Sequence, residues 1–213
     1  MRASLPIIVA AAALTGCAIP FSGATALAVP AGSVLYQDDF SSSATGWNRV
    51  QNDGGIMDYD GGGYRILVTA PEANVWSTPE RDFRDSRLEV DAGKLGGPDA
   101  NRIGLVCRAD GTSHYFFIVG SDGYYGLGIF TDGQAALLGQ SSMQPSEAII
   151  TGTAINHLRL DCSGSALSGY VNGVQVAGVQ DQTLTHGQAG VLAGTFDEPG
   201  ADIVFDNFVV LQP

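Results

Sequence analysis

The sequence contains few basic residues. Lys and Arg number 10 against 22 Asp and Glu, which gives a formal net charge of −12 and an isoelectric point of about 4.3. Proteins bind nucleic acid through clustered Lys and Arg, and the same residues attract proteins to anionic lipid surfaces. The composition therefore predicts no nucleic-acid partner and no electrostatic docking on a membrane.

Familiar catalytic and metal-binding motifs are also absent. Neither the Gly-x-Ser-x-Gly of serine hydrolases nor the His-Glu-x-x-His of zinc peptidases occurs in the chain. No cysteine–histidine cluster has the spacing of zinc ligands. The three histidines, at 114, 157 and 186, are scattered, so we expect surface or turn positions for them rather than a general base.

No apolar run reaches the roughly 18 residues that a membrane-spanning helix requires. The N-terminal run from Leu5 to Leu14 follows Arg2, and this order is typical of an export signal. The run ends in Leu14-Thr15-Gly16-Cys17, which resembles a bacterial lipobox. The resemblance implies a signal peptide over residues 1–16 and a lipidated Cys17 that anchors the protein to a membrane outside the cytoplasm. The alternative is an ordinary secretory signal with an incidental cysteine.

Cysteine is scarce, with three residues in the whole chain. If Cys17 carries lipid, Cys107 and Cys162 remain, and such a pair in an exported protein is most simply a disulfide. Cys107 alternates in phase with Leu105, and Cys162 with Leu160, so both cysteines point inward if these segments are strands. Two buried free thiols are the alternative.

The remaining chain divides into a tether and one domain. Residues 17–32 are rich in Ala, Pro, Ser and Gly and contain no charged residue, as expected of a tether. From residue 33 to 213 short β-rich runs alternate with turn dipeptides such as Asp132-Gly133 and Asn172-Gly173, which suit tight hairpins. The pattern predicts an all-β antiparallel sandwich of two sheets, with strands at 34–40, 64–68, 87–92, 102–108, 114–119, 124–130, 157–162, 167–171, 174–179, 190–194 and 203–211.

Several segments of this domain resemble a known superfamily. They are Asp38-Asp39-Phe40 with Gly46-Trp47, Tyr115-Phe116-Phe117-Ile118, Tyr170-Val171-Asn172-Gly173, and Phe205-Asp206-Asn207-Phe208. Together they are similar to the concanavalin A-like lectin/glucanase jelly rolls of bacterial exported proteins, over about residues 34–211. That resemblance implies a fold, and it leaves function open among lectins, glycosidases, sugar-binding modules and adhesion domains.

The glucanases of this superfamily carry Glu-x-Asp-x-x-Glu on one strand, and this chain carries part of that motif. Glu89 and Asp91 match its first two positions, whereas Lys94 occupies the third. A retaining glycosidase needs two carboxyl groups about 5 Å apart, one of which holds a proton. Because the second glutamate is missing, we assign no catalytic residue and expect a protein without this activity. The alternation of charged and apolar residues also suits any half-exposed strand.

Aromatic residues provide the candidate binding site. Tyr and Trp rings stack on the C–H faces of sugars and suit a partly wet groove. The segment 114–119 is apolar on both faces, so one face is expected in the core and the other on the floor of a groove. We predict Tyr115 and Tyr124 in that groove, with Arg108 at its edge and Trp76 as a further ligand-binding residue. Alternatively, these rings are core, or a loop covers this face.

Acidic residues near the ends of the domain suggest a structural calcium, the one cofactor considered. Asp38 opens the first strand, Asp197 lies in the turn before the last strand, and Asp206 lies within that strand. Calcium takes six to eight oxygen ligands, including carboxylates. Acidic turn residues that simply face water are the alternative in so acidic a protein.

These observations favour a lipid-anchored, non-catalytic β-sandwich that binds a carbohydrate or another surface ligand. Its expected partners are a glycan or cell-surface ligand, and a membrane only through the lipid anchor. A sugar-acting hydrolase of the jelly-roll type is the first alternative, and a structural lipoprotein with no small ligand is the second.

Overall fold

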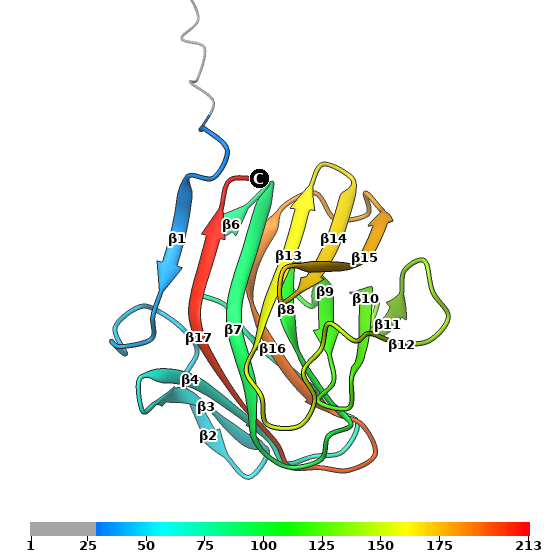
Figure 1. The fold of residues 1–213 in the computed structure, drawn as a ribbon. Helices are drawn as coiled ribbons and strands as arrows, with labels where there is room; N and C mark the ends of the chain where they lie inside the picture. Colours follow the sequence, from blue (N-terminus) through cyan, green and yellow to red (C-terminus); the bar gives the residue numbers. More distant parts are fainter. Residues whose placement is uncertain (1–28) are drawn as a thin grey trace, which may run out of the picture.

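The computed structural model describes residues 29–213, which form an all-β domain of two antiparallel sheets (Figure 1). The expected signal peptide, the expected lipidation site Cys17 and most of the expected tether lie outside these described residues. Within the described part, no helix is long and apolar enough to span a membrane.

The first sheet has nine strands, in the order β15-β14-β13-β7-β17-β4-β3-β2, with β1 also paired to β17. The long strands β7 and β17 form its centre. The bounds of its strands are β1 Val34–Asp38, β2 Val50–Asn52, β3 Gly55–Asp60, β4 Gly63–Val68, β7 Ser86–Gly96, β13 Asn156–Ser163, β14 Ala166–Val171, β15 Val174–Gln180 and β17 Ala201–Leu211.

The second sheet has eight strands, in the order β11-β10-β9-β8-β16-β5, with β12 paired to β10 and β6 paired to β16. Its strands are β5 Asn74–Ser77, β6 Asp82–Phe83, β8 Asn101–Asp110, β9 Ser113–Val119, β10 Tyr124–Thr131, β11 Gln134–Leu137, β12 Gln144–Pro145 and β16 Gly187–Thr195. The two-sheet antiparallel sandwich predicted from the sequence is therefore confirmed, although six of its shorter strands, β2, β3, β5, β6, β11 and β12, were not expected.

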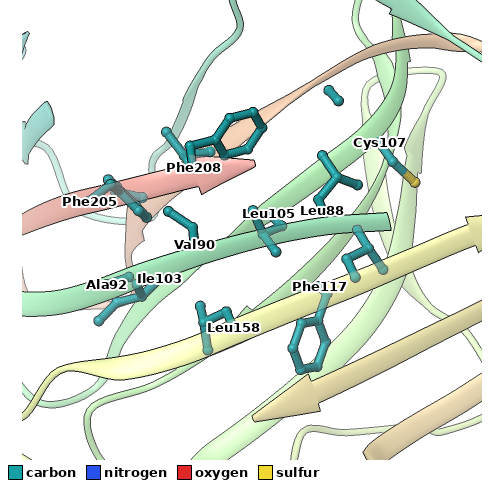
Figure 2. Packing of buried hydrophobic residues seen from close by; sticks show 14 of the residues in the cluster. Leu88, Val90, Ala92, Ile103, Leu105, Cys107, Phe117, Leu158, Phe205 and Phe208 are labelled. Carbon is teal, nitrogen blue, oxygen red and sulfur yellow. The ribbon is translucent and has the colours of Figure 1, made fainter. Parts of the chain in front are cut away.

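The core lies between the two sheets, where alternate residues of facing strands meet (Figure 2). Leu88 and Val90 of β7 are fully buried there, and so are Leu105 of β8 and Leu158 of β13. Trp47 also belongs to this core and is only 4% exposed. The period-2 alternation of apolar residues in the sequence therefore predicts the inward face of these strands correctly.

The predicted disulfide is also confirmed. Cys107 of β8 and Cys162 of β13 are bonded, with their Cα atoms 6.8 Å apart, and both are fully buried. Because β8 belongs to one sheet and β13 to the other, the bond joins the two layers across the core. The inward phase of both residues is what makes this bond geometrically accessible.

Candidate functional site

A hollow of about 390 Å³ lies over the outer face of the eight-stranded sheet. Its walls and floor are mainly apolar and belong to a second hydrophobic cluster, separate from the core between the sheets. The side chains that make most of this lining are Trp76, Phe116, Ile118, Phe130, Leu137 and Leu192. An open concavity with an apolar lining is the usual form of a small-molecule site.

Two glycines of β10 let side chains that line the hollow pack against this strand. Gly126 and Gly128 alternate with the inward-facing Leu127, so they lie on the outer face of the sheet. A Cβ atom at Gly128 would come within 2.4 Å of the Phe116 ring, and one at Gly126 within 2.8 Å of Leu137. Glycine at both positions therefore lets the neighbouring side chains lie close over the strand.

An aromatic stack closes one end of the hollow. The His114 ring lies between two larger rings, with its centroid 4.7 Å from that of Trp76 and 5.4 Å from that of Phe130. His114 is 3% exposed, and its burial lowers the pKa to about 4, although a hydrogen bond to the Thr112 carbonyl acts in the opposite direction. The imidazole is therefore neutral at neutral pH.

Polar side chains stand at the opposite end. Arg102 Nη1 donates to Asn74 Oδ1 at 2.9 Å and to the Thr195 carbonyl, while its guanidinium carbon lies 3.9 Å from the centroid of the Phe196 ring. Burial lowers the pKa of Arg102, and the nearby Glu72 partly offsets that effect. The hollow thus has an apolar middle, a buried imidazole at one end and a cation at the other.

A second hollow, of about 370 Å³, shares Trp76 with the first. Its lining is more polar and includes Glu80, Asp82, Asp110 and His186. His186 Nδ1 lies 3.1 Å from Asp82 Oδ2. Trp76 consequently lies between an apolar hollow and an acidic one. Among the four residues predicted to bind ligand, Trp76 is the one that lines both hollows.

The predicted orientation of Tyr115 is wrong. Tyr115 pairs directly with Cys107 across β9 and β8, and paired residues in an antiparallel ladder point to the same side. Because Cys107 faces the core, Tyr115 does too, and it is fully buried. Its hydroxyl group donates to Asp181 and accepts from the Leu184 N–H, and burial raises its pKa. The outward face of β9 belongs instead to Phe116 and Ile118, lining the first hollow.

Arg108 is also not at the edge of a groove. It lies at an irregularity in the pairing of β8 with β9, where its φ of 52° turns the side chain out of the regular alternation. Arg108 is 2% exposed, and its guanidinium group donates to the carbonyls of Arg84 and Leu184 and to Asp85 Oδ1. Arg108 therefore fastens two loops to the sheet.

Tyr124, the last of the predicted binding residues, is at the start of β10. Its neighbour Tyr125 pairs with the inward-facing Val119 and packs against the core, so Tyr124 lies on the outer face. It is 43% exposed and is not among the residues that line the two hollows.

The partial glucanase motif is on the other sheet. Glu89 and Asp91 project from β7 beside His157 of β13, whose Nδ1 lies 2.8 Å from Asp91 Oδ1 and whose Nε2 lies 3.5 Å from Glu89 Oε2. Lys94, in place of the second glutamate, forms a salt bridge with Asp99. The structure therefore separates these carboxylates from both hollows.

The three aspartates predicted to hold calcium are not brought together as a ligand set. Asp38 accepts hydrogen bonds from the Phe40 N–H and Trp47 Nε1, Asp206 accepts one from the N–H of the next residue, and Asp197 is exposed. Across residues 29–213, no group of three or more His, Cys, Asp or Glu side chains is arranged to hold a metal ion.

The fold is a jelly-roll β-sandwich of the kind seen in solved carbohydrate-binding, galectin-like and family 16 glycoside hydrolase structures. Similar solved structures include the carbohydrate binding module CBM66 from Bacillus subtilis, with a TM-score of 0.55, 19% identity, and coverage of 78% of this chain and 96% of that one. A protein of unknown function with a galectin-like fold, also from Bacillus subtilis, has a TM-score of 0.62 and 14% identity over 86% of this chain and 97% of its own.

A glycoside hydrolase family 16 endo-glucanase from Bacteroides ovatus gives a TM-score of 0.57 and 12% identity, covering 84% of this chain and all of that one. No family model matches the sequence, and no curated protein does. At these identities the likeness establishes the fold alone.

Proposed function

We propose that this chain is a lipid-anchored, extracytoplasmic module that binds a glycan without cleaving it, in the hollow over the eight-stranded sheet. The observation that carries the proposal is the half-buried Trp76 ring, which lines that hollow between a stacked imidazole and an open acidic concavity. A sugar offers a flat C–H face to such a ring and hydroxyl groups to the polar ends.

The comparisons support a sugar ligand at the level of fold. CBM66 is a carbohydrate binding module, and a Bacteroides ovatus family 16 protein from a mixed-linkage glucan locus, with this fold, was solved in complex with the product G4G4G3G. The absence of cleavage is supported by the incomplete motif, because Glu89 and Asp91 have Lys94 in place of the second glutamate. They also lie on the sheet opposite the hollow.

The anchor is proposed from the sequence. Leu14-Thr15-Gly16-Cys17 ends a short apolar run, and residues 18–32 separate Cys17 from the domain. A lipid at Cys17 and a tether of this length would hold the sandwich near a membrane surface while leaving its hollows open. Partition of the chain with membranes, lost in Cys17→Ser, is the expected result.

Tryptophan fluorescence offers a test of the binding site. The chain has two tryptophans, of which Trp47 is buried in the core and Trp76 lines the hollow. We expect the full chain, purified in detergent, to change its emission with at least one member of a glycan array. Trp76→Phe should remove that change, and Trp76→Ala should weaken binding about tenfold or more, as for an aromatic hot spot.

Three results would contradict the proposal in different ways. An array with no bound glycan would favour a structural lipoprotein. Release of reducing ends from a bound glycan would favour the hydrolase alternative, and loss of that activity in Glu89→Gln would place the chemistry on β7. Binding that persists unchanged in Trp76→Ala would move the site away from the hollow.

A further inference from the structure

His114 presents one hydrogen-bonding atom to the hollow in a fixed state. Its Nδ1 lies 3.1 Å from the carbonyl oxygen of Thr112, which only accepts hydrogen bonds, so Nδ1 carries the ring proton. Burial keeps the second proton off the ring, with a pKa of about 4. Above that pH, Nε2 is unprotonated, and its lone pair can accept a hydrogen bond.

Nε2 opens toward the hollow. The ring makes no other hydrogen bond, and within residues 29–213 every side-chain nitrogen or oxygen shut off from solvent has a partner. Nε2 is consequently not sealed in the protein, and the cavity that His114 lines is the first hollow. The aromatic rings around the His114 imidazole there are those of Trp76, Phe130 and Phe116, with centroids 4.7, 5.4 and 6.4 Å from that of His114. None of the three rings carries a charge.

The charged groups of the region stand elsewhere. Arg102 and Glu72 line the opposite end of the hollow. Arg102 precedes Ile103, which pairs with Val119, so it lies about 15–20 Å along the sheet from His114 at the start of β9. The carboxylates Glu80, Asp82 and Asp110, together with His186, line the hollow on the other side of Trp76. The aromatic end is thus an apolar site with a single acceptor.

From this geometry we infer that His114 Nε2 determines the specificity of the hollow, by accepting a hydrogen bond from a hydroxyl group of a neutral sugar unit. The inference rests on the proposed glycan function and names the class of sugar. A sugar hydroxyl group can donate a hydrogen bond to Nε2, while the C–H face of the sugar ring stacks on Trp76 or Phe130. A sugar carboxylate at the same point would bring a second acceptor against Nε2. The two would repel each other, and no cation of the hollow lies near enough to offset that repulsion.

Matched pairs of glycans test the inference. The probes are neutral hexose oligosaccharides and the same oligosaccharides oxidised at C6 to uronates, added to the full chain while Trp76 emission is recorded. We expect the neutral member of a pair to bind more tightly by about tenfold, the value of one hydrogen bond. Its affinity should be constant from pH 8 to about 5.5 and fall as the pH approaches 4, where Nε2 takes a proton.

His114→Phe keeps a ring in the stack and removes the acceptor, so it should lower the affinity for the neutral glycan about tenfold and abolish the decline between pH 5.5 and 4. His157→Phe, on the nine-stranded sheet, is the control and should change neither quantity. Because a merely structural histidine would also lower the stability of the domain on protonation, the decline in affinity is read only at pH values where urea denaturation shows the domain still folded.

The nitrogen-15 spectrum of the His114 imidazole provides a measurement that needs no variant. At pH 7 it should show a protonated Nδ1 and an unprotonated Nε2, and only Nε2 should shift when neutral glycan saturates the protein. A protonated Nε2, an unshifted Nε2, or tighter binding of uronates would overturn the inference while the binding function stands. No emission change with any glycan would overturn both.

Discussion

Reduction of the Cys107–Cys162 bond should destabilise the domain by a large and calculable amount. The two cysteines are 55 residues apart in sequence, and the bond joins the sheets through the core. In the chain-entropy account, closing a loop of that length removes unfolded-state entropy worth about 4 kcal/mol at 25 °C. Both cysteines are fully buried, so reduced thiols would stay in place and the loss would come from the unfolded chain.

Urea denaturation of the oxidised and reduced full chain measures this quantity directly. We expect the midpoint to fall on reduction, with a difference of about 4 kcal/mol in the free energy of unfolding. Cys107→Ala/Cys162→Ala should lose at least as much, because it also removes buried sulfur atoms. A difference below about 1 kcal/mol would refute the entropic reasoning, and peptide mapping without reduction that finds no Cys107–Cys162 linkage would refute the bond itself.

Three further predictions follow from the buried polar groups. Tyr115→Phe should cost about 1–2 kcal/mol of stability, by removing the hydroxyl group that bonds Asp181 and the Leu184 N–H, whereas Tyr115→Ala should cost about 4 kcal/mol in thermal melts because the site is core. Arg108→Met should cost about 3 kcal/mol in urea titrations, and Arg49→Met, which breaks an exposed pair, less than about 1 kcal/mol. Equal losses in these two variants would contradict the anchoring role of Arg108. The pKa of His114 is lowered from 6.5 to about 4 in the folded chain. As the pH falls from 6.5 to 4, the unfolded chain therefore binds a proton at this histidine before the folded chain does, and the free energy of unfolding should decrease by up to about 3 kcal/mol. His114→Phe should remove that part of the pH dependence in denaturation measured across this range.

Strand phase explains where sequence reasoning succeeded. Alternation places Leu105 and Cys107 on one side of β8, and Leu158 and Cys162 on one side of β13, whichever strands lie beside them. The inward faces and the disulfide were therefore predictable from neighbouring residues alone. The Asn172-Gly173 hairpin was predictable for the same reason, because both turn residues adopt the positive φ that this dipeptide favours.

Register explains where it did not succeed. The segment 114–119 is apolar on both faces, so hydrophobicity alone could not say which face of β9 meets the core. Only the pairing of Tyr115 with Cys107 decides that Phe116 and Ile118 face the hollow. At Arg108 a positive φ interrupts the alternation. The arginine was expected at the edge of a groove, and the structure instead buries it.

The sequence by itself determined the class of fold, the inward cysteine pair and the lack of a complete catalytic motif, because each depends on residues close together in the chain. The tertiary structure alone assembled the candidate site, since Trp76, His114 and Phe130 come from β5, β9 and β10 and meet only through sheet pairing and side-chain stacking. It also decided the state of His114, because burial by residues distant in sequence, and not the histidine itself, lowers its pKa.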